Sequence, residues 1–289
     1  MRRLIPAFLL ACLLVPSTAP AFDITDLSID DVTSIFESTE TLVAGEEFTP
    51  EQEYYIGRSV SATILDRYRP LKNKALTSYV NQLGQSLAMF SDRPQTFKGY
   101  HFLVLDSEEI NAFAAPGGFI FVTKGMLRCC RTEDALAAVL AHEISHVTLG
   151  HGIQAIEDSR TTQAFTSLAA IGAKTMTSGQ LGELTDLFAD SLKDITDTMI
   201  VNGYSKDYEF EADATAVALL ARAGYPRSAL VQMLQVMSQR LVPGGTDFAH
   251  THPQPQERIE ELSEVFTPTA CPPPPAPRQA RFQAALGAL

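Results

Sequence analysis

Positive charge is scarce in this sequence, and tryptophan is absent. The 289 residues contain 22 Lys and Arg against 34 Asp and Glu, which gives a formal net charge of -12 at pH 7. Proteins that bind nucleic acids neutralise phosphates with a basic face, so this balance argues against a nucleic-acid partner. It also argues against electrostatic docking on an anionic membrane. The lack of Trp excludes an interfacial belt of that residue.

Long hydrophobic runs are lacking as well. The apolar stretch Leu4–Val15 is shorter than the roughly 20 residues that a membrane-spanning helix needs. It follows two arginines and precedes Ala19-Pro20-Ala21, a small-residue cleavage pattern. We therefore predict an export signal peptide over residues 1–21, a mature chain without a membrane span, and a periplasmic location. The alternatives are a short membrane anchor or lipoprotein processing at Cys12, which is disfavoured because Cys12 lies inside the apolar run.

Cysteine is also rare, with four in the chain. If Cys12 leaves with the signal peptide, Cys129, Cys130 and Cys271 remain. Adjacent cysteines rarely pair with each other, because the bridge geometry is strained. In an oxidising compartment we expect Cys271 to bond one of the other two, and the alternative is that all three thiols are free.

The rest of the composition is that of a globular chain, with 45% hydrophobic and 19% charged residues. Such a length accommodates one large domain. We predict a loosely ordered lead-in over residues 22–48, a single domain over 49–265, and an extended Pro-rich tail over 266–289. The oligomeric state is left open.

The periodicity predicts a mostly helical α+β fold with a small sheet. Helices are expected over 49–68, 72–89, 205–223 and 227–241, and a further helix is expected to start at a Thr132 cap. The first of these helices starts with a capping box at Thr49. Strands are expected over His101–Leu105 and Phe119–Thr123, joined through a turn-rich connection at 111–118.

The helix after Thr132 carries the segment His142-Glu143-Ile144-Ser145-His146. Residues four apart lie on one face of a helix, so the two imidazoles can bind one Zn²⁺. Glu143 is offset around the helix and suits the role of general base toward the activated water. The alternative is a chance pattern with structural histidines, but burying these polar groups unpaired in an apolar helix would be costly.

A third ligand is available in the segment Tyr208–Asp213. Glu209 would complete the pattern of three protein ligands plus one water that catalytic zinc sites use. Asp213 lies four residues on, where it could accept a hydrogen bond from the outer nitrogen of a histidine ligand. The alternative is a solvated acidic helix face, although the interleaved Tyr208, Phe210 and Ala212 are not typical of a surface.

Several blocks in order resemble the HtpX/CAAX-prenyl-protease family of zinc metallopeptidases, and especially its soluble periplasmic BepA/LoiP-like branch. They cover about residues 50–262. The blocks are Asn111–Ala114 with Pro116–Gly118, Ala141–His151, Glu209 with Glu211–Asp213, Ala223–Tyr225, and Thr251–Pro253 with Glu257–Ile259.

This resemblance implies a gluzincin-type metallopeptidase domain over 49–265 that holds one Zn²⁺. It implies His142, His146 and Glu209 as metal ligands, Glu143 as general base and Asp213 as partner of a histidine ligand. It also implies that the strand after the two glycines is an edge strand beside the zinc cleft, where extended substrates pair by main-chain hydrogen bonds. The residues expected at that substrate strand are Asn111, Gly117, Gly118, Phe119, Ile120 and Phe121.

Two residues near the C-terminal end of the domain carry open roles. The resemblance implies that His252 approaches the zinc as a fourth ligand and holds the enzyme latent, as the matching histidine can in similar periplasmic members. The alternatives are that His252-Pro253 is only a loop feature or that His252 stabilises the oxyanion. Arg258 is a second candidate for the oxyanion role.

The motifs predict zinc-dependent endoproteolysis, and the resemblance implies that the substrates are misfolded or stalled envelope proteins, outer-membrane proteins among them. The first alternative is a chaperone-like assembly factor that binds extended clients and rarely cleaves. The second is a zinc site that serves structure only, although such sites are usually closed and rich in thiolates.

Overall fold

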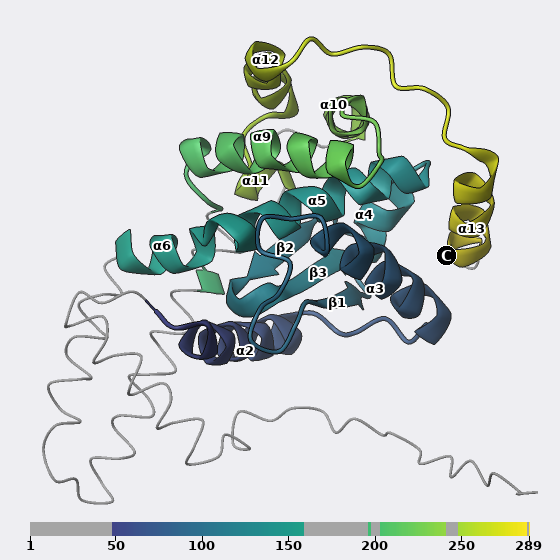
Figure 1. The fold of residues 1–289 in the computed structure, drawn as a ribbon. Coiled ribbons are helices and arrows are strands. Elements are labelled where there is room, and N and C mark those ends of the chain that lie inside the picture. Colours follow the sequence, from purple (N-terminus) through teal and green to yellow (C-terminus); the bar gives the residue numbers. More distant parts are fainter. Residues whose placement is uncertain (1–47, 159–195, 198–202, 241–247, 288) are drawn as a thin grey trace, which may run out of the picture.

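The computed structural model describes residues 48–158, 196–197, 203–240, 248–287 and 289. The predicted signal peptide, and all of the predicted lead-in except Phe48, lie outside the described residues. Within them, helices α2, α3, α4, α5 and α6 precede α9, α10, α11, α12 and α13, and a three-stranded sheet lies between α3 and α4 (Figure 1). The fold is therefore mostly helical α+β, as the periodicity predicts.

Local sequence signals explain where the first helices begin. Helix α2, Pro50–Arg67, starts at the capping box of Thr49 and Gln52, and α3, Lys74–Ala88, starts at the Asn73 cap. Helix α5, Glu133–Leu149, is capped by the Thr132 side chain. The other helices are α4, Lys124–Cys129; α6, His151–Asp158; α9, Lys206–Arg222; α10, Ser228–Arg240; α11, Phe248–Thr251; α12, Pro255–Val265; and α13, Ala276–Leu286.

The sheet corrects the expected position of the substrate strand. Strands β1, His101–Leu105, and β2, Ala112–Ala115, both pair with β3, Phe119–Thr123, so β3 is the central strand. Strand β1 runs parallel to β3 and β2 antiparallel to it. The connection expected at 111–118 thus contains a strand, and Phe119, Ile120 and Phe121 do not lie at an edge.

The burial of β3 explains its central place. Its Ile120 and Val122 side chains belong to the core cluster that includes α5, whereas Phe121 belongs to the cluster that includes α2. A strand that is covered on both faces reads as a continuous apolar run rather than an alternating one. The run at 119–123 therefore signals an interior strand.

The outer edge of β1 is occupied by other parts of the chain. The Phe102 N–H donates to Asn81 Oδ1 at 3.2 Å, and the Leu71 N–H donates to the Val104 carbonyl at 2.8 Å. Gln85 donates from its side chain to the Tyr100 carbonyl just before the strand. At the other edge of the described sheet lies β2, and no described strand or helix forms comparable hydrogen bonds with its outer side.

Helix α2 approaches the turn between β2 and β3 very closely. This turn is the 3₁₀ segment Pro116–Gly118, in which Gly117 adopts φ 73°. A Cβ on Gly57 of α2 would lie 1.8 Å from the Pro116 carbonyl oxygen. A glycine is therefore required where α2 crosses the turn, and this contact sets the position of β2.

The tail departs from the extended conformation expected over 266–289. It remains irregular through Pro272–Pro275, but α13 follows and lies beside α3, far from α12 (Figure 1). Phe282 of α13 is buried in the main core cluster. The C-terminal segment is thus anchored on the domain rather than detached from it.

Two arginines of α13 bind the first turn of α5. Arg281 forms an ion pair with Glu133, which also accepts hydrogen bonds from the Tyr79 and Tyr225 hydroxyls at 2.9 Å each. Arg278 lies 3.2 Å from Asp134. Because both carboxylates are buried, these partners compensate charges that would otherwise be costly at the start of α5.

The expected disulfide is not formed. Cys129, Cys130 and Cys271 are all free thiols, and the first two are buried. Burial raises the pKa of each of the three thiols, so they are protonated at neutral pH.

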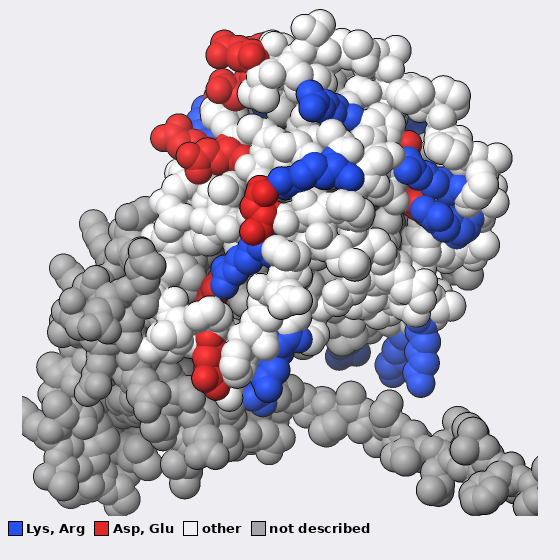
Figure 2. Space-filling view, in the orientation of Figure 1, with Lys and Arg blue, Asp and Glu red and all other residues white. Residues whose placement is uncertain are grey.

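The surface charges of the described residues are interspersed. On the face drawn in Figure 2, acidic and basic side chains lie next to one another between wide uncharged areas. Ion pairs such as Lys206–Glu257 at 2.6 Å and Arg222–Asp92 at 2.5 Å follow the same arrangement. No helix in the described ranges is both long and apolar enough to cross a bilayer.

The anchoring of α13 leads to a stability prediction. Replacing Arg281 with alanine leaves Glu133 buried with neutral donors only, so we expect a loss of about 1–3 kcal/mol in the free energy of unfolding. Thermal unfolding followed by circular dichroism measures the change. The matched control is Arg227→Ala at an exposed position, which should unfold at the wild-type temperature. If both variants unfold like the wild type, the ion pair does not anchor the tail.

Candidate metal centre

The centre is built where α5 and α9 pack side by side in the middle of the molecule (Figure 1). Every residue of α5 from Glu133 to Val147 is buried, because the sheet covers one side of the helix and α9 and α10 cover the other. Polar side chains on such a helix must find partners inside the protein. The histidines and the carboxylates of the two helices therefore face one another.

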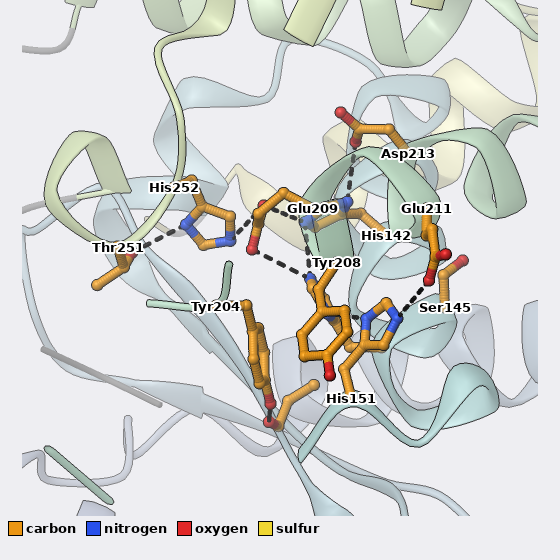
Figure 3. Close-up of polar contacts among 12 residues, drawn as sticks. His142, Ser145, His151, Tyr204, Tyr208, Glu209, Glu211, Asp213, Thr251 and His252 are labelled. Atoms are coloured by element: carbon orange, nitrogen blue, oxygen red, sulfur yellow. Dashed lines mark hydrogen bonds and ion pairs between the residues drawn. The ribbon is translucent and has the colours of Figure 1, made fainter. Parts of the chain in front are cut away.

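Four side chains converge on one point (Figure 3). The Nε2 atoms of His142 and His146 are 3.1 Å apart. The Glu209 carboxylate lies 3.4 Å from His142 Nε2 through Oε2 and 3.5 Å from His146 Nε2 through Oε1. His252 Nε2 lies 3.7 Å from Glu209 Oε2. One donor atom from each of these four residues lies within 4.8 Å of the other three.

The unsatisfied polar atoms indicate what the centre holds. Both oxygens of Glu209 are buried and have no hydrogen-bond partner in the described structure, and Glu143 Oε1 is in the same position. A buried carboxylate without a partner is unfavourable, and a cation between the imidazoles would compensate it. Two imidazole nitrogens and a carboxylate are ligands that Zn²⁺ accepts, so this donor set fits the expected metal.

Asp213 lies behind the first histidine. Its Oδ1 is 3.0 Å from His142 Nδ1, which leaves His142 Nε2 directed toward the centre. A carboxylate in this position sets the tautomer and the orientation of a metal-binding imidazole. Asp213 therefore occupies the position relative to His142 that its spacing on α9 predicts.

Arg258 contacts Asp213 and does not extend into an open cleft. The guanidinium donates to both oxygens of Asp213, at 2.8 Å from Nε and 2.6 Å from Nη2. Nη1 is 4.0 Å from Glu209 Oε2, and the side chain is 1% exposed. This bidentate pair holds the Asp213 carboxylate in place and balances its charge.

The pKa values reflect this arrangement. Burial alone would raise the pKa of Asp213, but the Arg258 charge and hydrogen bonds outweigh it and hold the value at about 2. Because this lies below the ordinary 3.8, the stabilisation from the carboxylate is present above about pH 4 and is lost as the pH falls toward 2. Burial raises the pKa of Glu143 to about 7.

The imidazoles differ among themselves. Burial holds the pKa of His146 and of His252 well below the usual range, so both are neutral, which is the form that binds metals. Burial also opposes a proton on His142, but its contacts with the Asp213 and Glu209 carboxylates outweigh it and raise its pKa to about 9. The carboxylates thus favour a positive charge at His142, and a bound cation would supply that charge in place of a proton on the imidazole.

His151 contacts His146, a candidate ligand, although the sequence predicted no role for it at the metal centre. Its Nδ1 is 2.9 Å from His146 Nδ1, and its Nε2 is 3.3 Å from Glu211 Oε2. Gly150 adopts φ 72° and ends α5, and α6 begins at the next residue, so the helical periodicity is interrupted between His146 and His151. A spacing of five residues does not place two side chains on one face of a helix, which is why periodicity did not reveal this contact.

Tyr204 is a second residue that sequence reasoning missed. Its ring stacks on His146 with centroids 4.5 Å apart, and its hydroxyl donates to the Ala114 carbonyl of β2 at 3.2 Å. Burial raises the pKa of this phenol, so it is a neutral donor. The residue precedes the Ser205 cap of α9, outside any periodic segment, and no local pattern marks it.

The residues expected to bind substrate are distributed around β2. Asn111 is buried, and its Oδ1 accepts the Ala112 N–H at 2.9 Å. The Gly117 N–H donates to Glu53 at 3.3 Å, and Gly118 completes the turn. The edge strand that flanks α5 is thus Ala112–Ala115. Asn111 precedes this strand and Gly117 and Gly118 follow it, so the residues expected to bind substrate lie at both of its ends.

Two helices that carry candidate metal ligands against a small sheet, with the pattern His-Glu-x-x-His, are typical of the HExxH class of metallopeptidases. Within it, the chain belongs to peptidase family M48, whose family model matches residues 74–265. The matched range contains His142, Glu143, His146, Glu209 and every other residue of the centre described above. The resemblance noted from the sequence is thereby confirmed.

The relatives include bacterial and mitochondrial proteases. The β-barrel assembly-enhancing protease of Escherichia coli K12 is 30% identical over 268 residues, which cover 90% of this chain and 52% of that protein. Metalloprotease LoiP of the same strain is 25% identical over 191 residues, or 66% of this chain and 69% of LoiP. Mitochondrial metalloendopeptidase OMA1 of Schizosaccharomyces pombe is 33% identical over 156 residues, or 53% of this chain and 43% of OMA1. The chain spans about half the length of the β-barrel assembly-enhancing proteases it matches.

The contact of Asp213 with His142 leads to a prediction about metal affinity. Asp213→Ala frees the imidazole and leaves the Arg258 charge unpaired beside it, so we expect zinc affinity to fall about 10- to 100-fold. Competition with a chelator of known affinity measures the change. Asp207→Ala, at an exposed position of the same helix, serves as the control and should bind zinc like the wild type. Wild-type affinity in Asp213→Ala would mean that this contact does not orient the ligand.

Proposed function

We propose that this protein is a zinc-dependent endopeptidase of the bacterial cell envelope. The observation that carries the proposal is the buried Glu209 carboxylate, whose oxygens accept no hydrogen bond in the described structure. It lies among two imidazoles of an HExxH helix, next to β2, an edge strand of the described sheet. His142, His146 and Glu209 would hold the metal. Zinc at this site would activate a water molecule and polarise the scissile carbonyl.

Glu143 is the proposed general base. It follows His142 on α5, is buried, and has one oxygen without a partner in the described structure. A carboxylate with a pKa of about 7 can accept the proton of the attacking water and then donate it to the leaving amine. The peptide C–N bond breaks as this nitrogen takes up the proton.

The substrate would bind along β2 as an added strand. Main-chain hydrogen bonds provide affinity in this mode without reading the side chains, which suits the hydrolysis of many unfolded or extended proteins. The assignment moves the substrate strand from Phe119–Phe121 to Ala112–Ala115. Support comes from the strand order, from the covered outer edge of β1 and from the packing of β2 on the metal helix.

The proposed clients are misfolded or stalled envelope proteins, outer-membrane proteins included. The name of the β-barrel assembly-enhancing protease supports this class, since that relative aligns with most of the chain. The predicted signal peptide over 1–21 supports export to the periplasm.

His252 is proposed to hold the centre in a latent state. Its Nε2 lies among the ligand atoms, and its ring stacks on Phe248 with centroids 3.6 Å apart. Its Nδ1 is 2.8 Å from Thr251 Oγ1, which helps to orient the imidazole toward the centre. A fourth protein ligand would occupy the position that water or substrate needs. The geometry favours this role over an oxyanion role, and Arg258 is assigned to holding Asp213.

The proposal predicts a selective loss of activity in Glu143→Gln. This change removes the general base but not a ligand, so we expect cleavage of denatured casein to fall by a factor on the order of 10² to 10⁴ while zinc content is unchanged. Glu51→Gln, at an exposed position of α2, is the control for a change of charge. A zinc-loaded wild type that does not cleave would favour the chaperone-like alternative. A wild type that takes up no zinc after supplementation would refute the ligand assignment.

The latent state predicts the opposite change for His252. Removing the imidazole opens the fourth position, so His252→Ala should cleave casein severalfold faster than the wild type at equal zinc content. His101→Ala, at an exposed position on β1, is the matched control and should leave the rate unchanged. A slower His252→Ala enzyme would instead assign His252 to stabilising the transition state.

A further inference from the structure

The outward side of β2 can be read from its hydrogen bonds. The Asn111 carbonyl accepts the Thr123 N–H at 3.0 Å, so position 111 faces β3. Neighbouring residues of a strand present their main-chain groups in opposite directions, hence Ala112 and Ala114 face away from β3. Their N–H and carbonyl groups are the ones that an added strand would have to pair with.

Side chains of the protein already occupy two of these outward groups. The Ala112 N–H is bound to Asn111 Oδ1, and the Ala114 carbonyl accepts the Tyr204 hydroxyl. Asn111 directly precedes the strand, whereas Tyr204 comes from the segment before α9, 90 residues after Ala114. An exposed strand edge tends to pair with other chains, and such caps prevent that pairing.

The ring of Tyr204 connects this cap to the metal centre. The stacking on His146 and the hydrogen bond to Ala114 place a single side chain between a metal ligand and the substrate strand. Glu209, a second candidate ligand, lies on α9 five residues after Tyr204, so Tyr204 and Glu209 are close in the chain. A peptide that displaces the Tyr204 hydroxyl therefore does so next to His146, whose orientation would affect a bound metal.

We propose that Tyr204 is a positioning residue that closes the substrate strand: its hydroxyl caps the Ala114 carbonyl, and an extended peptide must replace it with one of its own main-chain N–H groups. The ring meanwhile stays against His146. This inference rests on the proposed function, because it takes β2 as the substrate strand. It identifies the preferred ligand as an extended peptide with a free amide hydrogen opposite Ala114, and it disfavours proline or an N-methylated residue there.

The test compares peptide binding with and without the hydroxyl. In zinc-loaded Glu143→Gln protein, which does not turn the peptide over, a fluorescein-labelled β-casein peptide is titrated by fluorescence anisotropy. Tyr204→Phe keeps the stacked ring and removes the competing donor, so we expect binding roughly three- to tenfold tighter, the effect of one net hydrogen bond. The same peptide, N-methylated at each position in turn, should lose this gain at one position only.

Kinetics and metal content separate positioning from structure. Tyr204→Phe in the otherwise wild-type enzyme should lower KM with little change in kcat and unchanged zinc content. Tyr204→Leu also removes the stacking, so its zinc affinity should fall while that of Tyr204→Phe does not.

Two results would overturn the inference: equal or weaker peptide binding by Tyr204→Phe that retains zinc, or a fall in kcat at unchanged peptide affinity. Its failure can be told apart from failure of the proposed function. If wild type cleaves casein and Tyr204→Phe binds no better, only the inference fails. If wild type does not cleave but Tyr204→Phe binds the peptide more tightly, the inference stands and the protein is a binding factor.

Discussion

Burial of ionisable groups between α5 and α9 is the constraint on which the rest of the structure depends. Glu143, Glu209, Asp213 and Arg258 are at most 2% exposed, together with both histidines of the HExxH segment. Charges in such surroundings are tolerated only when they are paired, hydrogen-bonded or bound to a metal. Arg258 pairs with Asp213, and Asp213 contacts His142. Within the described structure this leaves both Glu209 oxygens and Glu143 Oε1 buried without a hydrogen bond. The proposed ligands, the proposed base and the residues that hold them thus form one connected group.

The sheet places an edge strand, β2, beside these buried residues, where an extended peptide is proposed to bind. Strand β3 is buried on both faces and β1 is covered at its outer edge, so β2 carries the remaining edge beside α5. The close contact of Gly57 with Pro116 holds the turn after β2, and Glu53 binds the Gly117 N–H of the same turn. Tyr204 then joins the β2 backbone to His146. The proposed substrate strand and the proposed metal ligands are therefore linked through short, direct contacts.

The N-terminal end of α5 is held by ion pairs with α13. Two arginines of α13 meet two buried carboxylates at the first turn of the helix, where negative charge also favours the helix dipole. Tyr79 and Tyr225 contribute further donors to Glu133. The metal helix is consequently fixed at both ends, at its start by the tail and near its end by the contacts of His146.

The sequence by itself determined the local parts of this protein. Caps at Thr49 and Thr132, the one-turn spacing of His142 and His146, and the four-residue spacing of Glu209 and Asp213 depend on helix geometry alone, and the helices formed as predicted. Only the tertiary structure decided the strand order, the contact of Arg258 with Asp213, the contact of His151 with His146 across the break at Gly150, the place of Tyr204 and the docking of α13. The physical reason is that each of these joins segments whose relative position depends on packing of the whole domain, or on one left-handed glycine, and no periodic pattern encodes it.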